Sequence, residues 1–63
     1  MKNKRIRMAM AQAGIRQTTL AEILGKSDKD ISIILNQYEL AVREQNEIVK
    51  RIREWAALNM KGA

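Results

Sequence analysis

Apolar residues recur along this chain at the spacing of one face of a helix. Ile6, Ala9, Met10 and Ala13 follow one another at intervals that bring their side chains onto one side of an α-helix. The same spacing returns in three later groups, which are Leu20, Ala21 and Leu24, then Ile31, Ile34 and Leu35, and last Ile48, Val49, Ile52, Trp55 and Ala56. The pattern predicts four helices. They are expected over about residues 3–13, 17–24, 28–36 and 42–59.

Residues that commonly end or begin helices lie between these segments. Gly14 and Gly25 follow the first two segments, and glycine is the usual C-terminal cap because it adopts the left-handed backbone conformation without strain. Ser27 and Asp30 have the spacing of a capping box, in which the hydroxyl accepts from a first-turn amide. We therefore expect the third helix to begin at Ser27 or Asp28. We expect it to end at Asn36.

The β-branched residues are the one argument for a strand, since isoleucine also suits a pleated sheet. The run from Ile31 to Leu35, however, does not alternate apolar with polar residues, and a capping signal precedes it. We therefore expect an all-α fold, a small domain of four helices.

Length and composition limit what such a chain can do. Its 63 residues suffice for one small domain, residues 1–63, and they include no Cys and no His. The commonest metal ligands, the commonest general base and any disulfide are therefore missing, and we expect no cofactor, no metal and no enzymatic activity. No apolar stretch approaches the roughly 20 residues of a membrane span, and the first ten residues lack the apolar core of a signal peptide. These features predict a cytoplasmic protein with no membrane partner.

The chain is basic, with twelve Lys and Arg against seven Asp and Glu. Residues 1–16 hold five of the basic side chains and no acidic one, so the positive charge is concentrated at the N-terminal end. Most of these charges are expected simply to lie in solvent. The excess nevertheless makes a polyanion such as nucleic acid a plausible partner.

The second and third predicted helices are short and are separated by a turn that contains Gly25. A small residue, Ala21, stands where the two helices would cross, and this arrangement is typical of a helix-turn-helix, whose second helix enters the DNA major groove. The stretch from Gln17 to Asn36 resembles the XRE family of phage Cro and repressor proteins. Eleven positions fit the pattern of that family: Gln17, Leu20, Ala21, Leu24, Gly25, Ser27, Ile31, Ser32, Ile34, Leu35 and Asn36. With Gly14 and Ile15, the resemblance covers roughly residues 4–58.

The resemblance implies a lambda-repressor-like fold and a sequence-specific, double-stranded DNA-binding transcriptional regulator. The tail of the chain looks like a subgroup of short phage and prophage regulators, so we expect a repressor-like protein of phage or mobile-element origin, acting in the cytoplasm of a bacterium or of a phage-infected host. Such proteins bind DNA as two-fold dimers. A homodimer is therefore expected, formed either in solution or only on DNA.

The same resemblance assigns contacts position by position. Gln17 matches a glutamine that touches a phosphate near the first base, and its amide offers both a donor and an acceptor. Four outward positions of the third helix are expected to read base edges: Asp28, Lys29, Ser32 and Ile33. Six more positions are expected to contact phosphates: Arg16, Thr18, Lys26, Ser27, Asn36 and Tyr38. Arg5 and Arg7 from the first helix are expected to add positive charge beside the backbone.

A different class of function also fits the third helix. Asp28 and Asp30 would be repelled by phosphates unless each carboxylate met a base amine, and first-turn acids also serve simply to stabilise a helix N-terminus. An apolar Ile33 flanked by carboxylates suits a basic protein surface. The alternative is a protein-interaction module on the same fold, an antirepressor or inhibitor that binds another protein.

The predicted last helix raises the question of dimerisation. We expect Ile48, Ile52 and Trp55 to cover the first and third helices, because a domain this small needs them for its core. Leu58 and Met60 are then the better candidates for a dimer surface.

Overall fold

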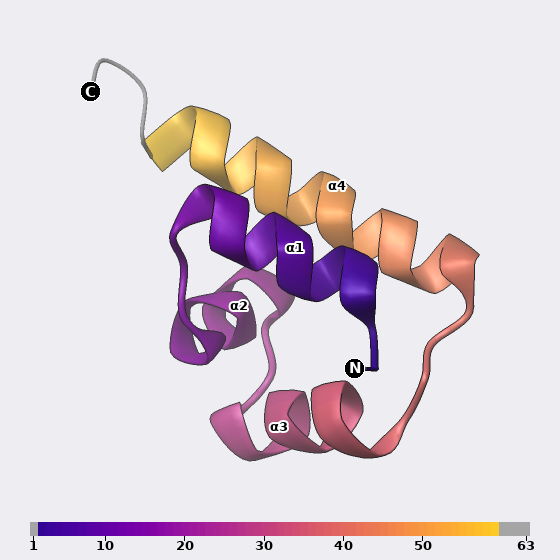
Figure 1. Cartoon of the computed structure of the whole chain (residues 1–63). Helices are drawn as coiled ribbons and strands as arrows, with labels where there is room; N and C mark the ends of the chain where they lie inside the picture. The colour runs from indigo at the N-terminus through magenta and orange to yellow at the C-terminus, as the bar shows by residue number, and fades with distance from the viewer. Residues whose placement is uncertain (1, 60–63) are drawn as a thin grey trace.

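A computed structural model describes residues 2–59, which form four α-helices and no strand. The helices are α1 (Lys4–Ala13), α2 (Gln17–Leu24), α3 (Asp28–Gln37) and α4 (Val42–Asn59). In Figure 1, α1 and α4 lie side by side, and α2 and α3 lie below them. The all-α class and the four helices are confirmed. Met60, expected at a dimer surface, lies outside the described residues.

Two glycines make the sharp turns after α1 and α2. Gly14 and Gly25 have φ angles of 66° and 67°, in the left-handed region. In each turn, the amide of the residue after the glycine bonds back into the preceding helix, at 3.0 Å for Ile15 and 2.9 Å for Lys26. A Cβ atom at either glycine would meet nothing within 4 Å. The backbone conformation, not lack of space, is therefore what favours glycine at both positions.

Helix α3 begins where the capping signal placed it. The Ser27 hydroxyl accepts from the Asp30 amide at 3.1 Å, and α3 starts at Asp28. The expectation that Asn36 ends the helix is wrong by one residue: α3 runs to Gln37, and Tyr38 follows in an extended conformation. The Asn36 amide donates along the helix to the Ser32 hydroxyl at 3.2 Å.

The hydrophobic core draws residues from all four helices. Its buried members are Ile6, Ala9, Leu20, Ala21, Ile31, Leu35 and Ile52. Helix α4 packs mainly against α1 and α2. The expected contact with the first helix is confirmed, and the expected contact with the third is wrong, since the second helix takes its place. Ile52 is fully buried, whereas Trp55 is only half-buried. Leu58 is 80% exposed and is therefore free to take part in an interface.

Helix α3 is tied to the N-terminal end of the chain by a fully buried asparagine, Asn3. Its side-chain amide donates to three main-chain carbonyls at the end of α3, those of Ile34 (3.1 Å), Leu35 (3.2 Å) and Tyr38 (2.7 Å). Its side-chain oxygen accepts from the Leu40 amide at 2.8 Å. Asn3 itself has a left-handed backbone (φ 56°), which asparagine tolerates better than most residues. We call this set of hydrogen bonds the Asn3 clamp.

A second buried polar residue, Gln45 at the start of α4, extends the same network. Its amide donates to a Glu39 carboxylate oxygen and to the Leu40 carbonyl, both at 2.9 Å, and its oxygen accepts from the Arg5 amide at 3.2 Å. The other Glu39 oxygen accepts from the main-chain amide of Asn3 at 3.1 Å. Among the described residues, no buried side-chain polar atom lacks a partner. Hydrogen bonds thus join the beginning of α1, the end of α3 and the beginning of α4.

Candidate nucleic-acid interface

The residues expected to contact DNA lie on the beginning of α2, on the turn that follows it and along α3. Eight of them are exposed: Arg16, Thr18, Lys26, Ser27, Asp28, Lys29, Asn36 and Tyr38. Gln17, Ser32 and Ile33 are half-buried. Ile33, expected to be an exposed apolar residue of the third helix, therefore offers only part of its side chain to a partner.

The first residues of α2 and α3 lie next to each other. The Gln17 amide donates to the Asp28 main-chain carbonyl at 3.5 Å, a long hydrogen bond that links the two helix starts. Amide groups at the N-termini of helices face outward and favour anions. The hydrogen bond from Gln17 thus holds the start of α2 beside the first turn of α3, so that both can contact one partner.

The two ends of α3 differ in what they offer. At its start, Lys29 is exposed beside Asp28 and Asp30, and the Ser27 hydroxyl is engaged as the cap. At its end, Tyr38 is 57% exposed and its carbonyl is held by Asn3. Ten residues of helix separate these ends by about 15 Å. The candidate residues thus form an elongated strip along α3 and not a single cluster.

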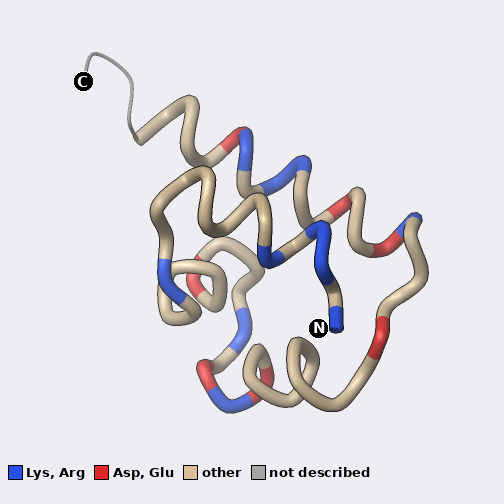
Figure 2. The backbone as a smooth tube through the Cα atoms, viewed as in Figure 1, with Lys and Arg blue, Asp and Glu red and all other residues tan. Residues whose placement is uncertain are grey.

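The segment of the chain that carries this strip has no net charge. Residues 16–38 carry three basic side chains and three acidic ones, and Figure 2 shows both colours at the start of α3. A strip of this kind attracts phosphates only where its cations are separated from its carboxylates. The excess positive charge of the chain must therefore lie on other elements.

Arg7 of α1 reaches α3, whereas Arg5 does not. The sequence offers no reason to expect different roles for these two arginines. The Arg7 guanidinium donates to the Leu35 carbonyl at 3.1 Å and to the Asn36 side-chain oxygen at 2.9 Å. It also donates to the Lys2 carbonyl at 2.9 Å. Arg5, two residues earlier, instead lines a hollow between α1 and α4. Of these two arginines, it is therefore Arg7 that adds positive charge beside α3.

The residue that sequence reasoning missed altogether is Asn3. Its side chain donates to one candidate site residue, at the Tyr38 carbonyl, and its hydrogen bonds fix the end of the helix that carries five of the eleven candidates. A single polar residue ahead of a helix has no periodic signal. The feature that distinguishes Asn3 is its left-handed backbone, which cannot be read from the sequence.

Residues 2–59 show neither a metal-binding cluster nor a membrane-spanning helix. This part of the chain has no group of three or more acidic residues placed to hold a metal ion. Over the same residues, no helix is both long enough and apolar enough to cross a bilayer. Neither a protein-family model, nor a curated protein, nor a solved structure matches the chain. Over residues 2–59, the protein is a small all-α domain of four helices.

Proposed function

We propose that this protein is a sequence-specific, double-stranded DNA-binding transcriptional regulator of the repressor type. In this proposal α2, the Gly25 turn and α3 form a helix-turn-helix, and α3 enters the major groove. The outward side chains of its first turns then face base edges, while Gln17 and the cations near the turn contact phosphates.

The observation that carries the proposal is the division of α3 into two faces. Ile31 and Leu35 are buried on its inner face, whereas Asp28, Lys29 and Asn36 are exposed. A major groove about 12 Å wide accepts a helix presented in this way. The adjacent start of α2 supplies the Gln17 amide at the edge of the same surface.

Specific chemistry follows for individual positions. Lys29 would donate to guanine N7 and O6, and Asp28 would accept from cytosine N4, which removes its repulsion from the neighbouring phosphates. The exposed part of Ile33 would contact a thymine methyl group. Arg16, Lys26 and Arg7 would supply the charge that is independent of sequence.

The protein would act as a homodimer on an inverted repeat. Half-sites about one DNA turn apart are expected for a two-fold pair of such helices. Leu58, exposed near the end of α4, is the described residue best placed to contribute to that dimer.

Selection of binding sites from a random duplex pool tests the proposal. We expect enrichment of an inverted repeat, and an affinity that falls with salt by about 0.9 log units per log unit of salt for each phosphate contacted. Gln17→Ala and Lys29→Ala should each weaken binding to the selected site by about tenfold, since one good contact is worth about 1–3 kcal/mol.

Lys50→Ala is the matched control for Lys29→Ala, because it removes the same charge from an exposed position on α4. It should change affinity by no more than about twofold, as expected for a charge outside the contact surface. Equal losses from Lys29→Ala and Lys50→Ala would indicate attraction by net charge alone. A pool without enrichment would overturn the proposal.

The exposed carboxylates favour one second candidate. Asp28 and Asp30 both lie in solvent at the start of α3, where they suit a basic protein partner. An antirepressor or inhibitor that uses this face would show no enriched DNA site. Its partner affinity would fall on Asp28→Asn and Asp30→Asn.

A further inference from the structure

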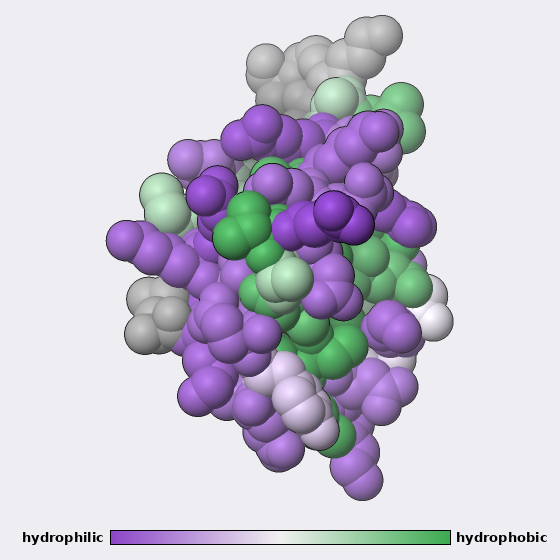
Figure 3. All heavy atoms as spheres, turned by 90° about the vertical axis from the view of Figure 1, so that its right-hand side faces the viewer, coloured by the Kyte–Doolittle hydropathy of each residue, from purple (hydrophilic) through white to green (hydrophobic). Residues whose placement is uncertain are grey.

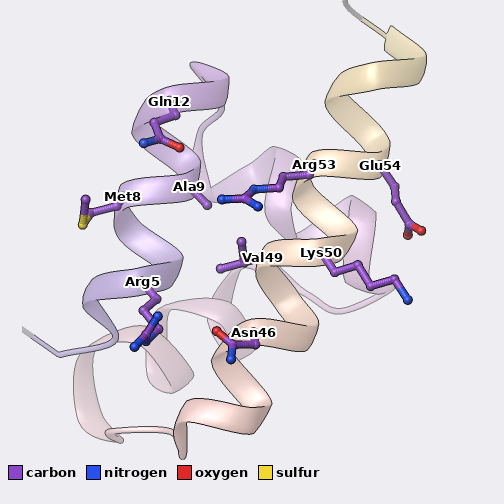
Figure 4. Close-up of a pocket in the computed structure, with 9 residues that line it drawn as sticks. All are labelled: Arg5, Met8, Ala9, Gln12, Asn46, Val49, Lys50, Arg53 and Glu54. Carbon is purple, nitrogen blue, oxygen red and sulfur yellow. The ribbon is translucent and has the colours of Figure 1, made fainter.

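A groove runs along the junction of α1 and α4, away from the candidate DNA-binding strip. Its central hollow has a volume of about 640 Å³ and is lined by both helices (Figure 4). A hollow of about 380 Å³ adjoins it through Arg5 and Met8, and one of about 190 Å³ adjoins it through Ala9, Gln12 and Arg53. The three hollows share lining residues and follow one another along the junction of the two helices, and we call them together the α1–α4 groove.

The middle of the groove is apolar. Ala9 and Val49 lie at its floor, and the Met8 side chain stands at one edge with 51% of its surface exposed. Val42, 54% exposed, lines the hollow of about 380 Å³ beside the start of α1. From the side where α3 leads into α4, Figure 3 shows hydrophobic residues in a strip bordered by hydrophilic ones. Methionine adapts its shape to apolar partners, which suits an edge that must accept a side chain.

The borders of the groove are predominantly basic. Lys4, Arg5, Lys50 and Arg53 line it and are exposed, against the carboxylates of Glu54 and Glu39. Both oxygens of Glu39 already accept hydrogen bonds, from the Asn3 amide and from Gln45. Figure 4 shows the Arg53 side chain extending from α4 toward α1, across the apolar floor. The groove thus combines an apolar floor with an excess of positive charge.

The length of the groove fits a helix. Its lining on α4 extends from Val42 to Ala56, which corresponds to about 21 Å, or nearly four helical turns. Amphipathic helices bind such grooves through apolar residues spaced three and four apart. We propose that the α1–α4 groove binds an acidic amphipathic helix of a partner protein. Its apolar side chains would contact Met8 and Val49, and its carboxylates would face Arg5 and Arg53.

The same features disfavour two other occupants. A DNA backbone would satisfy the cations but would leave Met8 and Val49 without an apolar partner. A second copy docked through the same groove would bring the same excess of cations, four basic lining residues against two acidic ones, and like charges in contact oppose association. An acidic amphipathic helix offers apolar side chains to the floor of the groove and carboxylates to its basic border.

Three synthetic helical peptides of about 15 residues, the length that the groove accommodates, test the chemistry. The first has Leu at helical spacing on one face with Glu on both sides of it, the second has Gln in place of Glu, and the third has Ala in place of Leu. Binding is followed by fluorescence anisotropy at about 0.15 M salt. We expect the first peptide to bind, and each of the others to bind at least about tenfold more weakly, equivalent to 1.4 kcal/mol.

Amide chemical shifts of the protein locate the bound peptide. We expect the largest changes near Met8, Gln12, Val49 and Arg53. Absence of binding, equal binding of the Gln peptide, or changes centred on α3 would each overturn the proposal. So would displacement of the peptide by duplex DNA that produces the same shift changes in the groove.

Matched charge variants separate a specific groove from simple attraction to a basic protein. Arg5→Gln with Arg53→Gln removes two cations from the groove, and Lys26→Gln with Lys29→Gln removes two from the region around α3. The first pair of substitutions should lower the affinity for the acidic peptide by about tenfold or more, and the second pair should lower it by less than about twofold. Met8→Ser, at an exposed position, should weaken it by about threefold. Equal effects of the two charge pairs would overturn the proposal.

Discussion

Helices α1 and α4 are joined to each other in a different way from helix α3. The α1–α4 pair is held mainly by apolar side chains, with Ile6 and Ile52 fully buried, and by one hydrogen bond at its beginning, from the Arg5 main-chain amide to the Gln45 side-chain oxygen. Helix α3 buries Ile31 and Leu35 in the same core, but its C-terminal end is held by hydrogen bonds from Asn3 and Arg7.

The two kinds of contact have different effects: the apolar contacts mainly stabilise the fold, and the hydrogen bonds mainly fix the position of the end of α3. Apolar contacts are non-directional, so along most of its length the α1–α4 pair is held without contacts that depend on angle. Hydrogen bonds to carbonyls depend on distance and angle, so the Asn3 clamp specifies where α3 ends. The helix proposed to read DNA is thus the one whose end is fixed by directional contacts.

The largest expected effect comes from breaking the apolar pair. Ile52→Ala removes a fully buried side chain and should lower the free energy of unfolding by about 3–4 kcal/mol. Total stability is roughly 3–9 kcal/mol for a chain of this size, so the variant is expected to lose at least about a third of it. Urea titration followed by circular dichroism measures the loss. Leu58→Ala, at a position 80% exposed, is the control and should change stability by less than about 0.5 kcal/mol.

Breaking the Asn3 clamp should cost less but still be severe. Asn3→Ala removes all four side-chain hydrogen bonds, and we expect a loss of about 2–3 kcal/mol in the same titration. The side-chain and backbone contributions are separated by Asn3→Gly, which keeps the left-handed conformation accessible. Glycine should recover about 1 kcal/mol relative to alanine. A loss below about 0.5 kcal/mol for Asn3→Ala would show that the clamp does not hold α3.

Arg7→Ala sharpens the comparison because it weakens only the polar attachment. The guanidinium donates to Leu35 and Asn36, and its removal should cost about 1–1.5 kcal/mol. Hydrogen exchange should show the loss as faster exchange in the last turn of α3, with protection around Ile52 unchanged. Uniformly faster exchange throughout the chain would contradict a local role for Arg7.

The smallest expected effect lies at the other end of α3. Ser27→Ala removes the cap on the Asp30 amide and should cost about 0.5–1 kcal/mol. Ser27→Gly should cost only a few tenths of a kcal/mol, because glycine is an acceptable N-cap. Thermal unfolding of both variants tests this order. Equal losses would indicate that the hydroxyl does not act as the cap.

The sequence predicted the features that depend on local chemistry. Apolar periodicity gave the four helices, and Gly14, Gly25 and Ser27 marked the points where the backbone must turn or where a first-turn amide needs an acceptor. The Asn36 stop was wrong because residue preference at a helix end is weak, and carbonyls near the end of α3 are satisfied by Asn3 instead.

Features that depend on distant contacts were beyond local patterns. The partners of α4 were partly wrong because an apolar stripe shows that a face is buried without showing against which helix. The buried positions of Asn3 and Gln45 were missed because polar residues are normally exposed. Arg5 and Arg7 lie two residues apart but belong to different surfaces, since successive helical positions face different directions.

The Asn3 clamp has a consequence for the lifetime of the folded state. Its bond to Leu40 joins residues 37 apart in the chain, whereas the Gln17 bond to Asp28 joins residues 11 apart. Closing the longer loop costs about 1 kcal/mol more entropy, so we expect the clamp to close after the rate-limiting step of folding. Its loss would then speed unfolding and leave the folding rate unchanged. Asn3 would thus govern how long the protein stays folded, and not how quickly it folds.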